Sequence, residues 1–416
     1  MAGRSFCVAG PDAGLRRACA AGNRGRSRRG FTARCPRVLS QSDPCGRAAA
    51  RYQRFTELKT ALVHDYLNQR GGAERVFAHI AAAFPDAPVY TALYDAKLNG
   101  DIVAPARVRR SWLARVPFAN QSFRMLAPLY PSAFARFDFS RFDTIVSSTT
   151  AWAKGIRVPT GAVHVCYINT VSRFLFAYDR YVGGFGVRQL ARPLAAALAR
   201  WDLAAARRPT AYIANSQNVA ARVKQYYGRD AYVLPCPVDV ERFSVGNGGG
   251  GYFFVASRLL PYKRIDLAIA AAQLAGVPLL VAGTGPAERA LRQVAKGTTT
   301  RMLGFIHDDD LAAYMANARA VIVPGEEDFG LVPLEAAAAG RPAIAYRAGG
   351  ALETVIEGET GTFFAHQDAQ SLAAVLRTFD EDTFSSVRLR SHAEGFAPQR
   401  FIERLRAIVN EVRAAQ

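Results

Sequence analysis

Residues 320–340 read AVIVPGEEDFGLVPLEAAAAG. The apolar start of this stretch, residues 320–323, predicts a buried strand of a parallel sheet. Pro324 and Gly325 then turn the chain, and residues 331–339 predict a helix that ends at Gly340. The stretch is therefore a strand, an acidic turn and a helix, which is the repeating unit of a parallel α/β sheet.

Two carboxylates, Glu327 and Glu335, flank the start of this helix. Between them lie Phe329, Gly330 and Leu331, and backbone N–H groups at a helix start lack partners within the helix and favour an anion. An acidic pair around an anion site fits a ligand that carries both hydroxyl groups and phosphate. We expect a sugar and a ribose to donate hydroxyls to the carboxylates while a diphosphate binds at the helix start.

Strand and helix patterns alternate through the rest of the chain. They predict an α/β fold of two doubly wound, Rossmann-like domains that face each other across a ligand cleft. The glycine-rich residues 246–251 predict a hinge, which gives domains at 57–240 and 241–416. The amphipathic helix at about residues 398–414 is expected to pack on one or both domains. The predicted strands are residues 59–64, 144–147, 163–167, 212–214 and 232–234, then 252–256, 278–282, 301–303, 320–323 and 343–346.

Residues 1–56 hold twelve arginines and two aspartates, which is +10 of the formal net charge of +19. They lack hydrophobic periodicity and are predicted to be disordered. They resemble an organellar transit peptide in composition, but we favour a non-native extension that precedes a true start near Thr56. The surplus of positive charge in the rest of the chain is moderate, so we expect no nucleic acid as a partner. Phosphorylated substrates or an anionic membrane surface are equally compatible with this charge.

Basic residues and glycines follow the first strand of each half. Arg258 and Lys263 come after the strand at 252–256, where both could reach a diphosphate. Gly71 and Gly72 lie between the first strand and the first helix of the chain. They would allow a ligand to approach the backbone closely, or they serve only a tight turn.

Three consecutive aspartates, Asp308, Asp309 and Asp310, have the spacing by which some sugar-transferring enzymes hold a metal. They come just before a helix predicted at residues 311–318, so we assign them to N-capping and to the helix dipole. No other carboxylate and histidine cluster has ligand spacing. We therefore expect no metal and no cofactor.

Residues 107–130 interleave arginine with aromatic and aliphatic side chains. Such a segment could lie on a membrane or hold a lipid-linked acceptor. An ordinary surface helix, whose arginine stems cover apolar surface, explains the pattern equally well.

The E-x7-E spacing of Glu327 and Glu335, with Arg258 and Lys263, makes the chain resemble the glycosyltransferases of family 4 over about residues 59–412. The resemblance implies the GT-B architecture of two facing Rossmann-like domains, retention of the anomeric configuration and no need for a metal. It implies that Glu327 contacts the donor sugar and Glu335 the ribose. It also implies that Arg258 and Lys263 contact the diphosphate of a nucleotide-sugar, which is a substrate and not a cofactor, and that the loop at 71–72 closes on this donor.

Within this family the chain is similar to bacterial mannosyltransferases of O-antigen, capsule and exopolysaccharide assembly. Relatives often carry histidine where this chain has Thr150, and another where it has Asn169. The second histidine contacts the donor sugar in related enzymes, so Asn169 and the nearby Arg173 are expected to bind substrate. The similar stretches are VHDYL at 63–67, RGGAE at 70–74, SSTTAWAKG at 147–155 and ANSQNVA at 214–220.

The resemblance implies transfer of a sugar, with mannose from GDP-mannose as the expected donor, to a glycan or a polyprenyl-diphosphate-linked acceptor. The expected location is the cytoplasm, at the inner face of a bacterial membrane. Two alternatives keep the fold. A nucleotide-sugar epimerase would convert the donor without any acceptor, and a non-catalytic assembly protein would only bind the nucleotide-sugar.

Overall fold

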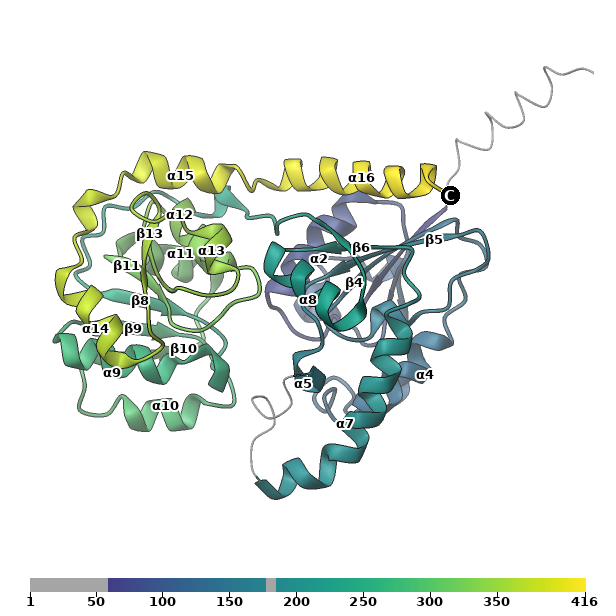
Figure 1. Cartoon of the computed structure of the whole chain (residues 1–416), viewed down its shortest axis with the longest axis horizontal. Coiled ribbons are helices and arrows are strands. Elements are labelled where there is room, and N and C mark those ends of the chain that lie inside the picture. Colours follow the sequence, from purple (N-terminus) through teal and green to yellow (C-terminus); the bar gives the residue numbers. More distant parts are fainter. Residues whose placement is uncertain (1–58, 177–184) are drawn as a thin grey trace, which may run out of the picture. The chain divides into compact units, whose positions relative to one another are not determined.

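The computed structural model describes residues 59–176 and 185–416 (Figure 1). The expectations for residues 1–56 lie outside these ranges. Two parallel β-sheets, each with helices on both faces, make up the described chain. The α/β fold class predicted from the alternating pattern is therefore confirmed.

The first sheet has seven strands in the order β3-β2-β1-β4-β5-β6-β7. Every neighbouring pair is parallel. On β1, Leu62 packs with Phe77 of helix α2 (Gly72–Ala83), while Ala61 and Val63 pack with Phe134 of α4 (Tyr130–Ala135) on the other face. Alternate residues of one strand thus bury against different helices, as strands buried on both faces must. The strands are Thr60–His64 (β1), Val89–Thr91 (β2), Val108–Arg110 (β3), Thr144–Thr149 (β4), Val163–Ile168 (β5), Ala211–Ala214 (β6) and Ala231–Val233 (β7).

The second sheet has six parallel strands in the order β10-β9-β8-β11-β12-β13. β8 (Phe253–Ala256) lies beside β11 (Ala320–Val323), so the segments that leave their carboxyl ends are neighbours. This adjacency is what brings the basic residues after β8 to the acidic turn after β11. The other strands are Leu279–Ala282 (β9), Thr300–Gly304 (β10), Ala343–Tyr346 (β12) and Gly361–Phe364 (β13).

Helices cover both faces of this second sheet (Figure 1). Ala320 and Ile322 of β11 pack in one apolar cluster with α9 and α14, and Val321 packs in another with α12 and α15. The helices of this half are α9 (Ile265–Ala275), α10 (Glu288–Val294), α11 (Asp308–Asn317), α12 (Leu331–Ala338), α13 (Ala351–Thr354), α14 (Ala369–Thr378), α15 (Ser386–Glu394) and α16 (Pro398–Ala414). The first half further contains α3 (Ala96–Asn99), α5 (Arg173–Phe176), α7 (Phe185–Ala205) and α8 (Gln217–Tyr227).

The sequence patterns missed three strands, β2, β3 and β13. β3 carries the exposed side chains of Arg109 and Arg110 at the edge of its sheet, where pairing with one neighbour suffices and polar residues are tolerated. The alternative of an ordinary surface helix over residues 107–130 is therefore wrong for the first part of this segment. The segment is β3 followed by a short 3-10 helix, η2 (Trp112–Arg115).

The three consecutive aspartates also lie differently from the prediction. α11 begins at Asp308, so all three occupy its first turn, and the N-cap residue is His307, whose side chain makes no capping hydrogen bond. The aspartates still complement the positive end of the helix dipole.

The glycine-rich residues 246–251, predicted to be a hinge, form backbone hydrogen bonds with residues at the ends of α11 and α12. Gly246 N donates to Ala339 O, and Gly248 N and Gly250 N donate to Ala316 O and Asn317 O. α16 contacts the first half, where Phe401 packs edge-on to Tyr167 with ring centroids 5.7 Å apart and Arg406 Nε donates to Ala83 O at 2.8 Å. Across residues 59–176 and 185–416, no helix is both long and apolar enough to cross a membrane.

Candidate functional site

Lys263 and Glu327 meet where the segments after β8 and β11 run side by side. Lys263 ends a short 3-10 helix, η6 (Pro261–Lys263), and its Nζ lies 2.5 Å from both carboxylate oxygens of Glu327. Gly325 permits this approach, because a Cβ at that position would stand 2.8 Å from Lys263 Cα. The acidic turn and the basic segment are therefore fitted to each other through their backbones as well as through this ion pair.

The start of α12 lies next to this pair. Its N-cap residue, Gly330, has a left-handed φ of 100°, and no side chain caps the helix. A residue with a Cβ would be strained there and would also meet Thr354 Oγ1 at 2.8 Å. The helix start thus presents backbone donors and the positive end of a dipole beside Glu327.

Gly71 and Gly72 lie beside the same helix start. A Cβ on Gly72 would stand 3.2 Å from Leu331 Cδ1, and one on Gly71 would stand 3.0 Å from Glu74 Oε2. Gly71 has an extended φ of −152°, so no left-handed turn requires it. The glycines instead allow α2 to begin close to α12 and make room for the Glu74 carboxyl.

Glu335 points from α12 toward α2. Its side chain is almost fully buried, and Arg75 Nη1 donates to Glu335 Oε1 at 2.9 Å. Burial raises the pKa of Glu335 above its usual range, while the charges of Arg75 and Arg242 lower it. Arg75 was not among the residues picked out from the sequence, because 260 positions separate it from Glu335.

Helix α8 holds the acidic turn from the first half. Ser216 Oγ donates to Asp328 O at 2.7 Å, and Arg222 lies 2.5 Å from both Glu326 Oε1 and Asp328 Oδ1. The carboxylate of Glu353 in turn accepts from the first backbone N–H groups of α8, at 2.7 and 2.9 Å. Arg222 lies two residues beyond the stretch at 214–220 that resembles the family, so that stretch did not include it.

Arg258 is exposed and lies near a buried carboxyl of the first half. Burial raises the pKa of Glu74 to about 7, while a hydrogen bond from Gln69 and the charge of Arg258 lower it. Arg258 also lowers the pKa of Arg124 by repulsion, after the larger effect of burial. The charge of Arg258 therefore acts on groups of the first half, whereas Lys263 is paired with Glu327 in the second.

Asn169 follows β5 and is buried. Its Nδ2 donates to Ser148 Oγ at 3.1 Å and to Thr149 O at 3.3 Å, which joins the ends of β4 and β5. Arg173 is the first residue of α5, a few residues further along the same segment.

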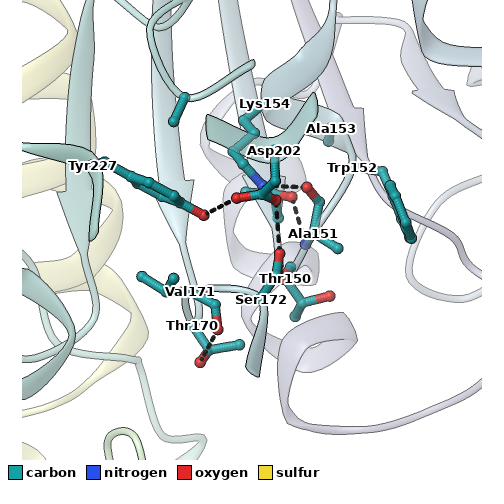
Figure 2. Close-up of polar contacts among 12 residues, drawn as sticks. Thr150, Ala151, Trp152, Ala153, Lys154, Thr170, Val171, Ser172, Asp202 and Tyr227 are labelled. Carbon is teal, nitrogen blue, oxygen red and sulfur yellow. Dashed lines mark hydrogen bonds and ion pairs between the residues drawn. The ribbon is translucent and has the colours of Figure 1, made fainter. Parts of the chain in front are cut away.

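A buried ion pair fixes the loops after β4 and β5 (Figure 2). Lys154 and Asp202 have side-chain exposures of 1% and 0%, and Lys154 Nζ lies 2.6 Å from Asp202 Oδ1. Asp202 also accepts from Ser172 Oγ at 2.9 Å and from Tyr227 OH at 2.7 Å, and Lys154 donates to Ala151 O. Helices α7 and α8 are thereby tied to both loops.

Asp65 holds the loop after β4 from the other side. Its two oxygens accept six hydrogen bonds, between 2.7 and 3.0 Å long, and four of these come from the consecutive backbone N–H groups of residues 150–153. Thr150, one of the two positions where relatives carry histidine, is thus held at both its N–H and its hydroxyl. Among the residues that the structure covers, no three histidine, cysteine, aspartate or glutamate side chains are grouped to hold a metal.

Solved structures share this architecture. Sucrose-phosphate synthase from Thermosynechococcus elongatus is 19% identical, with a TM-score of 0.66 over 86% of this chain and 100% of that one. HepE from Anabaena, solved with UDP-glucose, is 21% identical, with a TM-score of 0.61 over 86% of this chain and 100% of its own. The likeness shows the fold, which is that of the two-domain GT-B glycosyltransferases.

Curated relatives match shorter segments. A D-inositol 3-phosphate glycosyltransferase of Geodermatophilus obscurus is 31% identical over 46% of this chain and 50% of its own length. A GDP-mannose-dependent alpha-(1-6)-phosphatidylinositol monomannoside mannosyltransferase of Mycolicibacterium smegmatis is 29% identical over 39% of this chain and 50% of its own. The chain thus matches half the length of these two relatives.

Two family descriptions match successive parts of the chain. Residues 70–242 match Glycosyltransferase Family 4, and residues 238–396 match Glycosyl transferases group 1. The chain belongs to the family 4 glycosyltransferases.

Proposed function

We propose that the protein is a retaining glycosyltransferase that moves a sugar from a nucleotide-sugar to a glycan or a lipid-linked acceptor. The observation that carries this proposal is the contact between Lys263 and Glu327 beside the uncapped start of α12. A cation and a carboxylate beside a helix start match the diphosphate and the sugar hydroxyls of such a donor.

The residues of the site have different roles in the proposed reaction. The acceptor oxygen forms a bond to the anomeric carbon while the bond from that carbon to the diphosphate oxygen breaks, and a leaving phosphate oxygen takes the acceptor proton. Lys263, Arg258 and the N–H groups at the start of α12 stabilise the charge that develops on the diphosphate. Glu327 orients the sugar by accepting its hydroxyls. Binding of the diphosphate must draw Lys263 at least partly away from Glu327, which frees the carboxylate for the sugar.

The proposed donor is GDP-mannose. Similarity to the M. smegmatis enzyme, which is named for its dependence on GDP-mannose, supports this choice. HepE was solved with UDP-glucose, which makes uridine donors the alternative to test.

Thermal melting in the presence of nucleotide-sugars tests the donor. We expect GDP-mannose at about a hundred times its dissociation constant to stabilise the protein by about 2.7 kcal/mol, since a ligand that binds only the folded state adds that much. UDP-glucose and UDP-N-acetylglucosamine at the same concentration should shift the melting temperature less. A shift with uridine donors alone would overturn the mannosyl assignment and leave the reaction class intact.

We also propose that residues 107–130 contact the inner face of a bacterial membrane, where a lipid-linked acceptor would lie. Phe118 and Met125 have exposures of 78% and 82%, and Arg115 and Arg124 are exposed on the same segment. Phe118 also has a left-handed φ of 57°, an uncommon backbone conformation for a bulky residue. Apolar tips among arginines are suited to the headgroup region of an anionic bilayer.

Co-sedimentation with vesicles tests this contact. Replacing Phe118 and Met125 by serine should lower binding to vesicles that contain phosphatidylglycerol by about a hundredfold or more, because two apolar side chains no longer enter the bilayer. Val387→Ser is the matched control, since Val387 is 75% exposed on α15. Equal binding by the double variant and the control would contradict membrane contact through this segment.

A further inference from the structure

Arg75 bridges two carboxylates of the second half. Its Nη1 donates to Glu335 Oε1 at 2.9 Å and its Nη2 to Asp308 Oδ1 at 2.8 Å. Arg242 of the 3-10 helix η5 (Val240–Arg242) lies 3.2 Å from the other oxygen of Asp308. The guanidinium of Arg75 therefore lies between its two partners, and it donates to one of the two Glu335 oxygens.

The charge state of Glu335 depends on this contact. Glu335 is 7% exposed, and burial raises the pKa of its carboxyl. Arg75 opposes that effect more than any other group, Arg242 adds to it, and Asp308 works against both. Without Arg75, the pKa of the Glu335 carboxyl would be higher still, which favours its protonated form.

Charged groups on the remaining elements packed against α12 have partners elsewhere. Arg390 of α15 donates to the carbonyl oxygens of Ala338 and Phe243. Glu353 of α13 accepts from the backbone of α8. Arg75 and Arg242 are the cations that act on Glu335.

We propose that Arg75 is a positioning residue for the ribose of the donor: it orients Glu335 as a carboxylate, with one oxygen bound to the guanidinium and the other available to the ribose hydroxyls. This proposal rests on the proposed function, in which Glu335 contacts ribose. Because Arg75 lies on α2 and Glu335 on α12, the ribose site is complete only when both halves contribute to it. A vicinal diol would recognise such a carboxylate through charge-assisted hydrogen bonds, which are stronger than neutral ones.

If the contact between Arg75 and Glu335 served only to join the two halves, its loss would affect the binding of ribonucleotides and deoxyribonucleotides equally. The test therefore measures dissociation constants of GDP and 2′-deoxy-GDP, and of UDP and 2′-deoxy-UDP, by calorimetry at pH 7. The wild-type protein should prefer the ribonucleotide in the pair whose base it accepts. Arg75→Gln should weaken ribonucleotide binding by about tenfold or more, the usual effect of losing a hydrogen bond to a charged group. The deoxynucleotide should be affected much less, so that the preference nearly disappears.

Two further measurements separate this role from a general loss of structure. As the pH rises, Glu335 of the Arg75→Gln variant ionises and the preference for ribose should return. In a Glu335→Gln background, Arg75→Gln should have no further effect on the preference. Arg388→Gln is the matched control, because Arg388 forms an exposed ion pair with Glu359.

The outcomes are distinct. A ribose preference that Arg75→Gln leaves unchanged, or equal weakening of ribo- and deoxynucleotide, would overturn the role of Arg75 and leave the proposed function standing. Wild-type protein that binds no nucleoside diphosphate would overturn the proposed function and this assignment with it.

Discussion

Lys263→Ala should lower the rate of sugar transfer by about a hundredfold or more, because one electrostatic contact to developing charge is typically worth that much. Lys263 Nζ lies 2.5 Å from both oxygens of Glu327 and sits beside the start of α12, so its loss removes a cation from the site and leaves the Glu327 carboxylate without this partner. Glu327→Ala should have a comparable effect, since the sugar would lose the acceptor that orients it. Initial rates with saturating donor and acceptor measure both variants.

Lys224→Ala is the control for this experiment. Lys224 pairs with Asp230 at 2.8 Å, but its side chain is 59% exposed on α8 and contacts none of the proposed site. The control should transfer sugar at the wild-type rate, and all three variants should melt close to the wild-type temperature. Turnover near the wild-type value in Lys263→Ala or Glu327→Ala would rule out the assigned site.

Lys154→Met should destabilise the protein by about 3–5 kcal/mol, the usual cost of removing one partner from a buried ion pair. Asp202 would remain buried, with the hydroxyls of Ser172 and Tyr227 as its other partners, and two hydroxyls do not replace an ammonium charge. Lys154 and its neighbours come from the loops after β4 and β5 and from two helices (Figure 2), so the loss should also loosen the loop that holds Thr150. Denaturant unfolding monitored by tryptophan fluorescence measures the change, because Trp152 and Trp201 pack together nearby with ring centroids 5.6 Å apart.

The same substitution at an exposed lysine, Lys224→Met, should change the free energy of unfolding by less than about 1 kcal/mol. Replacing both members of the buried pair, in Lys154→Met with Asp202→Leu, should recover part of the lost stability, because no buried charge is then left alone. A wild-type unfolding midpoint for Lys154→Met would contradict this account of the pair.

The fold could be predicted because the signals that decide it are local. Residues 320–323 are apolar at every position, which is what a strand needs when α9 and α14 cover one face and α12 and α15 the other. Pro324, Gly325 and Gly340 marked where this strand and its helix end. Edge strand β3 gave no such signal, because Arg109 and Arg110 face solvent.

The candidate site could be predicted only in part. Lys263 and Glu327 follow neighbouring strands of a parallel sheet. Because the carboxyl ends of such strands lie at the same edge, the two residues can be expected to lie close together from the strand pattern alone. Arg75 and Glu335, or Lys154 and Asp202, meet because helices from separate parts of the chain pack side by side. No residue spacing encodes such a meeting, so these pairs required the structure.

At position 65, hydrogen-bonding chemistry rather than side-chain size restricts which residue can be accommodated. Each of its oxygens receives three donors. Asparagine has the same shape, but its amide nitrogen would turn two N–H groups toward three other donors. Aspartate alone, among side chains of this size, can accept from all of them. The loop that carries Thr150 is therefore shaped by a single acceptor placed at the end of the first strand.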